Sequence, residues 1–187
     1  AYLSRMEPAI ITHHGFVDKY IGDAIMAIFP EDPDDAVESA ISMVRTLAIY
    51  NRHRMSSGYV PIAIGIGINT GELMLGTIGG SCHIEGTVIS DAVNTAARLE
   101  EMTKIYGASI LIAEHTFHNL LRPQHYAMRV VDRGAVKGKK EMITVWEILE
   151  SASKDIHEAK LATAKQFEEG ISCYYAQQFA EALSLFE

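Results

Sequence analysis

The chain has 187 residues, of which 48% are hydrophobic and 21% charged, and its formal net charge is −8 at pH 7. This composition is typical of a soluble globular protein that is long enough to bury a full core. The negative charge argues against general affinity for nucleic acid or for an anionic membrane, since both need clustered positive charge. The sequence shows no transmembrane run, no signal peptide and only two cysteines, so we expect a cytoplasmic protein.

Helix and strand patterns alternate along the first part of the chain. Residues 2–13 carry apolar side chains at helical spacing. Two strands, 16–21 and 24–29, follow around a Gly-Asp turn. Because the second of them has no polar residue, we expect it to be a buried central strand. A long amphipathic helix then runs from residue 36 to about residue 54.

The middle of the chain predicts further strands around one helix. Residues 62–68 and 72–78 are expected to pair as a hairpin, with a loop over 79–86. Gly65 and Gly67 are expected to let another backbone or a ligand come close. The remaining elements are a helix from Ser90 or Asp91 to 106, a strand 109–113, a helix 114–121, and strands 126–131 and 143–149. Several strand pairs are hairpins, which favours an α+β fold with helices over a mostly antiparallel sheet.

The composition changes after residue 150. Residues 151–187 form a second, helical unit without a strand pattern. Gly170, Ala182 and Phe186 match the spacing of a tetratricopeptide repeat, so this unit is either the start of such a repeat or a plain amphipathic tail. In both cases it offers a surface for a protein partner.

Two polar positions are candidates for chemistry. Asp23 is a lone carboxylate in the turn of an otherwise apolar hairpin, where it either makes the turn or binds a hard cation such as Mg²⁺. Asn94 and Arg98 are four residues apart and therefore share one face of a helix. Without further information they are a solvated polar pair, with Arg98 bonded to a neighbouring glutamate.

Four motifs, in order and at compatible spacing, resemble the catalytic domain of class III adenylate and guanylate cyclases. They are VDKYIGDAIMAIF at 17–29, GIGINTGE at 65–72, DAVNTAARLE at 91–100 and VKGK at 136–139. The resemblance covers residues 1 to about 150. It implies an α+β, ferredoxin-like core, of which two copies pair head to tail and form active sites between them.

The resemblance also assigns roles to individual residues. It implies two divalent cations, Mg²⁺ or Mn²⁺, and gives Asp23 as one of the two aspartates that bind them. It gives Asn94 and Arg98 as the residues that stabilise the transition state. The substrate-binding residues that it implies are Lys19 and Thr87 for the base, and Lys137, with Lys139 as the alternative, for the terminal phosphates.

The activity implied is conversion of ATP to 3′,5′-cyclic AMP and pyrophosphate by a homodimer in a signalling protein. Lys19 with Thr87 favours ATP over GTP in this family. The alternatives are a guanylate cyclase and a regulatory or scaffolding domain that has lost catalysis. The near-complete set of site residues argues against such a loss.

One departure from the family concerns the start of the sequence. The family's first metal aspartate lies on a strand before the first helix, and this sequence begins inside that helix. We therefore expect the chain by itself to lack an edge of its central sheet, to bind metal poorly and to be inactive or nearly so. The intact protein is expected to be an enzyme.

Overall fold

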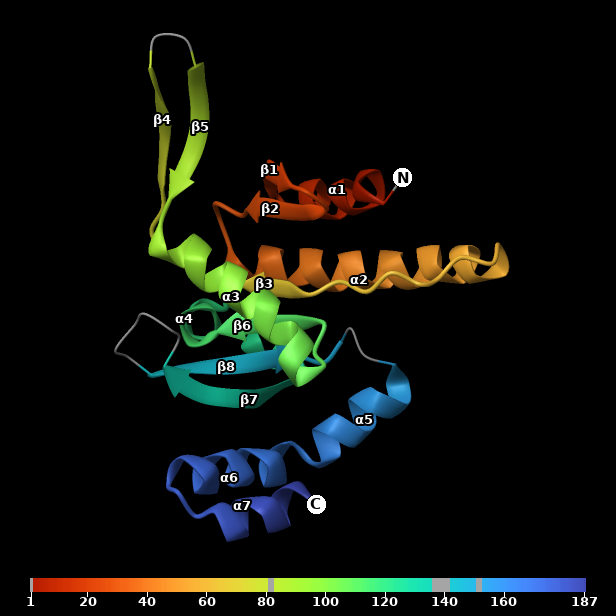
Figure 1. The fold of residues 1–187 in the computed structure, drawn as a ribbon, viewed down its shortest axis with the longest axis vertical. Helices are drawn as coiled ribbons and strands as arrows, with labels where there is room; N and C mark the ends of the chain where they lie inside the picture. The colour runs from red at the N-terminus through yellow and green to blue at the C-terminus, as the bar shows by residue number, and fades with distance from the viewer. Residues whose placement is uncertain (1, 81–82, 136–141, 151–152) are drawn as a thin grey trace.

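A four-stranded sheet lies at the centre of the computed structural model, which describes residues 2–80, 83–135, 142–150 and 153–187 (Figure 1). The strand order is β3-β6-β8-β7, in which β3 is parallel to β6 and the other neighbours are antiparallel. The bounds are β3 Ile66–Ile68, β6 Ile110–Ala113, β7 Met128–Ala135 and β8 Met142–Ile148.

Two long helices cover opposite faces of this sheet. They are α2, Pro33–Ser56, and α3, Asp91–Tyr106. Ile110 and Ile112 of β6 belong to one core cluster with residues of α2, whereas Leu111 belongs to a second cluster with Leu99 of α3. Successive side chains of a strand point to opposite faces, so β6 is buried between the two helices. The result is a three-layer arrangement with its core on both sides of β6.

The first hairpin does not join the central sheet. After α1, Leu3–Thr12, the strands β1, Phe16–Ile21, and β2, Ala24–Ile28, pair only with each other. The prediction of a buried central strand is therefore wrong, since Ile28 is the one buried residue of β2. An apolar strand is buried in the middle of a sheet only when it has a neighbour on each side, and β2 has β1 alone among the described residues.

The predicted pairing of residues 62–68 with 72–78 is also wrong. Strand β3 begins only at Ile66 and pairs with β6. Ile62 lies outside the strand, and both of its backbone groups are hydrogen-bonded to the Asn51 side chain on α2, at 2.7 and 2.9 Å. Strand β4, Met74–Gly80, instead pairs with β5, His83–Ile89, in a hairpin that projects from the body (Figure 1). Part of the segment expected to be a loop is therefore strand.

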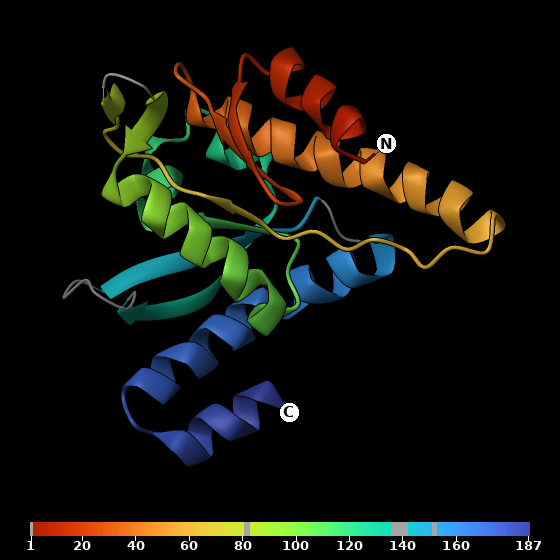
Figure 2. The ribbon, with the colours of Figure 1, turned by 45° about the horizontal axis from the view of Figure 1, so that its top comes forward.

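The C-terminal helices follow β8, with α6 beside β7 and α7 packed on α6 (Figures 1 and 2). They are α5, Lys154–Ala162, α6, Ala164–Tyr175, and α7, Phe179–Phe186. Helices α6 and α7 pack as a hairpin in which a Cβ on Gly170 would lie 2.6 Å from the Phe186 ring, and Ala182 is buried. The tetratricopeptide assignment stays a prediction. The short elements α4, Glu114–Asn119, and η1, Pro123–His125, connect β6 to β7.

Among the helices that the structure describes, none combines the length and the apolar character that crossing a bilayer requires.

A buried carboxylate, Asp34, links the start of α2 to the segment that connects β6 to β7. Asp34 is fully buried and accepts hydrogen bonds from the Leu121 amide at 2.7 Å and the Tyr126 hydroxyl at 3.1 Å, with Arg122 Nε at 3.3 Å. Burial by itself raises the pKa of Asp34, but these hydrogen bonds and the Arg122 charge outweigh it, so the pKa lies below its usual range. The ionised form therefore stabilises the fold.

We predict that Asp34→Ala lowers the free energy of unfolding at pH 7 by about 3 kcal/mol, because it leaves buried donors unpaired. A lowered pKa in the folded state means that this contribution is present above the unfolded-state pKa, about 3.9, and is lost as pH falls further. Urea denaturation at pH 7 and pH 3 measures both effects. The control Asp35→Ala removes an ion pair with exposed His14 and should cost less than about 1 kcal/mol. Equal losses at the two pH values would contradict this account.

Candidate functional site

Helix α3, which carries Asn94 and Arg98, is fixed at its N-terminal end by side chains. Ser90 Oγ accepts from the Ala92 amide at 2.9 Å and donates to the Glu72 carbonyl at 2.5 Å. Asn69 Nδ2 donates to the Ala92 carbonyl at 3.2 Å. The bond to the Ala92 amide satisfies a free N–H group of the first turn, and the other two tie the start of the helix to Asn69 and Glu72.

The backbone of α3 lies directly against β3 because that segment contains glycine. A Cβ on Gly67 would lie 2.2 Å from the Ala96 carbonyl oxygen and 2.4 Å from the Glu100 amide nitrogen. A Cβ on Gly65, just before the strand, would lie 2.0 Å from Thr103 Oγ1. The prediction that these glycines let another backbone or a ligand come close is confirmed for a backbone at Gly67, whereas the nearest atom at Gly65 belongs to the Thr103 side chain. Any larger residue would push α3 away from the sheet.

This contact determines which face of α3 is presented to solvent. Ala92, Thr95, Leu99 and Thr103 are the buried residues of the helix. Asn94 is exposed and Arg98 is half-buried, so both lie outside the buried stripe. A guanidinium and an amide, four residues apart on a rigid helix, form a surface that can bind an anionic oxygen and a neighbouring hydroxyl.

The hairpin β1–β2 carries the other two described candidates. Asp23 is exposed in the turn after Gly22, whose φ of +63° favours glycine. The pKa of Tyr2 is raised by burial and by the charge of Asp23, so this carboxylate lies near the start of α1. Lys19 is half-buried on β1.

Sequence reasoning missed the residue that pairs with Lys19. Asp18 lies in the bulge of β1, and its Oδ2 is 3.4 Å from Lys19 Nζ. That oxygen is buried and accepts no hydrogen bond from any described residue. The signal in the sequence is an acidic residue inside an apolar strand, next to the lysine. Asp18 limits the directions in which the lysine can point.

The remaining candidates are only partly described. Thr87 lies on β5 opposite Gly76, whereas Lys137 and Lys139 lie outside the described residues. The hairpin with Lys19 and Asp23 packs beside α1, and α3 packs on β3 and β6 (Figure 2).

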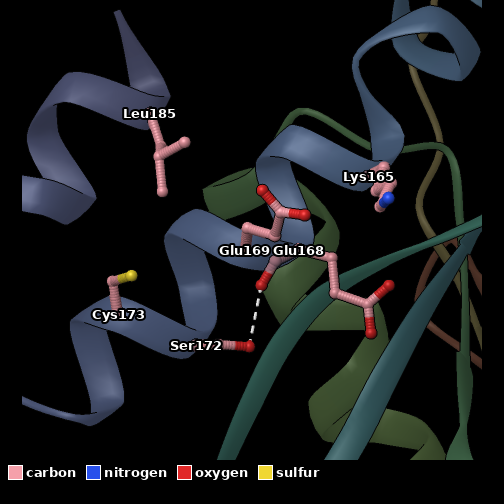
Figure 3. Close-up of a pocket in the computed structure, with 6 residues that line it drawn as sticks. All are labelled: Lys165, Glu168, Glu169, Ser172, Cys173 and Leu185. Carbon is pink, nitrogen blue, oxygen red and sulfur yellow. Dashed lines mark hydrogen bonds between the residues drawn. The ribbon is translucent and has the colours of Figure 1, made fainter.

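Two other features are poor nucleotide sites. His14, Glu31 and Asp35 have ligand atoms within 4.8 Å of one another, but they are at the surface and His14 is already paired with Asp35 at 3.0 Å. The groove in Figure 3 lies on the tail, on neither α3 nor the hairpin β1–β2. Its charged residues are Lys165, Glu168 and Glu169, an excess of negative charge that disfavours a triphosphate.

A guanidinium and an amide outside the buried stripe of one helix, on an α+β sheet domain, can bind a phosphate group. The family model described as adenylate and guanylate cyclase catalytic domain matches residues 4–148. Adenylate cyclase of Anabaena cylindrica is 44% identical over 153 residues, which is 79% of this chain and 30% of that protein. The terminal-differentiation-specific adenylate cyclase of Dictyostelium discoideum is 36% identical over an alignment of 194 residues, covering 100% of this chain and 9% of that protein.

Solved structures agree with the sequence comparisons. Guanylyl cyclase Cya2 is 29% identical with a TM-score of 0.66, over 79% of this chain and 76% of that one. Adenylyl cyclase CyaB of P. aeruginosa is 26% identical with a TM-score of 0.66, over 79% and 78%. The chain therefore belongs to the adenylate and guanylate cyclase catalytic-domain family and has its α+β, ferredoxin-like core. It spans less than a third of the two curated relatives described above.

We predict that Gly67→Ala destabilises the fold by about 2 to 3 kcal/mol, because the new methyl group overlaps the backbone of α3. Denaturation in urea measures the loss. In the control Gly58→Ala the new methyl group enters open space, but the backbone has a φ of +79°. This variant therefore loses only the free energy of backbone strain, about 1 kcal/mol. A Gly67→Ala variant as stable as the native chain would show that α3 does not depend on this contact.

Proposed function

We propose that the intact protein is an adenylate cyclase, which converts ATP to 3′,5′-cyclic AMP and pyrophosphate in a signalling role. The observation that carries the proposal is the placement of Asn94 and Arg98 outside the buried stripe of a helix that is fixed against the sheet. Membership of the cyclase family and the two adenylate cyclase relatives support the reaction class.

We further propose that the active site forms between two copies of this chain. Asp23 lies in the exposed turn of the hairpin β1–β2, which packs beside α1, whereas α3 packs on β3 and β6. A two-fold pair brings a hairpin of one copy to α3 of the other, and gives two equivalent sites. One subunit then supplies Asp23, and its partner supplies Lys19, Thr87, Asn94, Arg98 and Lys137.

The residues of this site act mainly by position and charge, as in other phosphoryl-transfer sites. The ribose 3′-oxygen attacks the α-phosphorus of the same nucleotide, and pyrophosphate leaves. Arg98 neutralises the charge that develops on the α-phosphate, and Asn94 holds the ribose in the attacking orientation. Lys137 binds the terminal phosphates as a point charge.

Asp23 fits a divalent cation as one ligand of a shared site. Mg²⁺ binds in such sites through one or two carboxylates together with substrate phosphates, and an exposed aspartate at a hairpin turn leaves room for both. When bound, two such cations, Mg²⁺ or Mn²⁺, would supply positive charge at the attacking oxygen and at the leaving pyrophosphate. The proposal concerns the intact protein, because the chain spans 30% and 9% of the two adenylate cyclase relatives.

A guanylate cyclase is the second candidate, because Cya2, a guanylyl cyclase, is among the similar solved structures. We favour ATP since the Lys19 ammonium donates to the ring nitrogen N1 of adenine, and the Thr87 hydroxyl accepts from its amino group. A competition assay with both nucleotides, in which cyclic AMP and cyclic GMP are separated, distinguishes the two activities.

We predict that Asn94→Ala and Arg98→Ala each lower the turnover of ATP by the intact protein at least about tenfold, because each removes a group that stabilises the transition state. Cyclic AMP formation at saturating ATP measures the effect. The control Lys104→Ala removes a positive charge from the same helix, whose partner is Glu100 at the surface, and should leave turnover unchanged. Wild-type rates of cyclic AMP formation in both alanine variants would refute this mechanism.

A further inference from the structure

One carboxylate joins the end of α3, the edge strand β7 and the tail. Asp132, next to a bulge in β7, accepts from the Tyr106 hydroxyl at 2.7 Å through Oδ2. Its Oδ1 accepts from the Tyr175 hydroxyl at 2.5 Å. Tyr106 is the last residue of α3 and Tyr175 is the last residue of α6. Asp132 therefore links α3 to α6 through two tyrosines that are 69 positions apart in the sequence.

The tail is attached along β7 by further polar contacts. Arg133 forms an ion pair with Glu168 of α6, and its Nη1 lies 3.4 Å from Ser172 Oγ. The Arg129 guanidinium lies 4.7 Å from the centre of the Phe167 ring. Helix α6 therefore follows the edge strand for most of its length (Figure 1). These contacts hold Tyr175 where its hydroxyl reaches Asp132.

The core of the sheet also relies on a cation from the tail. Glu147 of β8 is buried, and its carboxylate is paired with Arg129 at 2.8 Å and with Lys160 of α5 at 2.5 Å. A buried carboxylate is costly unless it is paired. An independent appendage would not supply one of the two cations that pair with it, so we treat α5 and α6 as part of the catalytic domain's scaffold.

The bridge at Asp132 keeps its donors protonated at physiological pH. Burial, followed by the hydrogen bond to Asp132, raises the pKa of Tyr175 to about 12. The same two causes raise the pKa of Tyr106 above its usual range. Both hydroxyls therefore donate to the carboxylate throughout the neutral range.

We infer that Asp132, Tyr106 and Tyr175 are positioning residues, through which the C-terminal helices hold α3 in the place that Asn94 and Arg98 need. Tyr106 is eight residues beyond Arg98, about 12 Å along a rigid helix. A shift at this end is therefore transmitted to the guanidinium. The effect on turnover rests on the proposed function.

The experiment compares Tyr175→Phe with Tyr174→Phe in the intact protein. The first variant removes only the hydroxyl that reaches Asp132. The second is a matched control, because the Tyr174 ring packs on Tyr175 and Phe179, contacts that phenylalanine keeps. Two quantities are measured at a temperature where both variants are fully folded by circular dichroism. They are kcat and KM for ATP, and hydrogen exchange of the α3 amides.

We expect Tyr175→Phe to lower kcat about three- to tenfold with KM changed less than about twofold, since a small misplacement affects the transition state most. The exchange of amides at the C-terminal end of α3 should become at least about threefold faster. Tyr106→Phe should behave in the same way and Tyr174→Phe like the native protein. Unchanged kcat and unchanged exchange in both bridge variants would overturn the inference, as would an equal effect of Tyr174→Phe.

Hydrogen exchange separates this inference from the proposed function. Faster exchange in α3, in a protein whose wild type forms no cyclic nucleotide, supports the bridge and refutes the cyclase activity. If the wild type is an active cyclase and a bridge variant keeps the native kcat, the bridge is refuted and the cyclase activity is supported.

Discussion

The contact between Gly67 of β3 and the backbone of α3 is the constraint on which the rest of the structure depends. The space that a Cβ would occupy at Gly67 is taken by the Ala96 carbonyl and the Glu100 amide. With the helix this close, Leu99 reaches the cluster on that face of β6, while Asn94 and Arg98 stay outside the buried stripe. One missing side chain therefore sets both the packing of the core and the direction of the two polar groups.

The other fixed points of α3 act together with this contact. Ser90 caps its first turn, and Tyr106 binds Asp132 at its last residue. Between these ends the helix has few ways to rotate or slide, which is what a site acting by position and charge requires. The tail reaches the same carboxylate through Tyr175, so the fold links the C-terminal helices to the helix that carries Asn94 and Arg98.

The sequence predicted local features well and pairing poorly. The bounds of α3, the turn at Gly22-Asp23 and the close approach at Gly65 and Gly67 follow from capping, turn chemistry and glycine content, which are local. The predicted pairing of 62–68 with 72–78 was wrong, because strand pairing depends on residues distant in sequence. One example is Asn51, whose side chain hydrogen-bonds both backbone groups of Ile62. The sequence did not predict the Asp132 bridge, since no periodic pattern relates Tyr106, Asp132 and Tyr175.

The central claim is that a carboxylate of one chain and a guanidinium of another serve the same nucleotide. Mixing Asp23→Ala and Arg98→Ala variants of the intact protein tests it most directly. Each variant alone should be inactive, but the mixed dimer contains one site with both native groups, so subunit exchange at equal amounts should restore about a quarter of the native activity. If mixed dimers form, as shown by tagging each variant, and cyclic AMP production stays at the level of the single variants, the shared site does not exist.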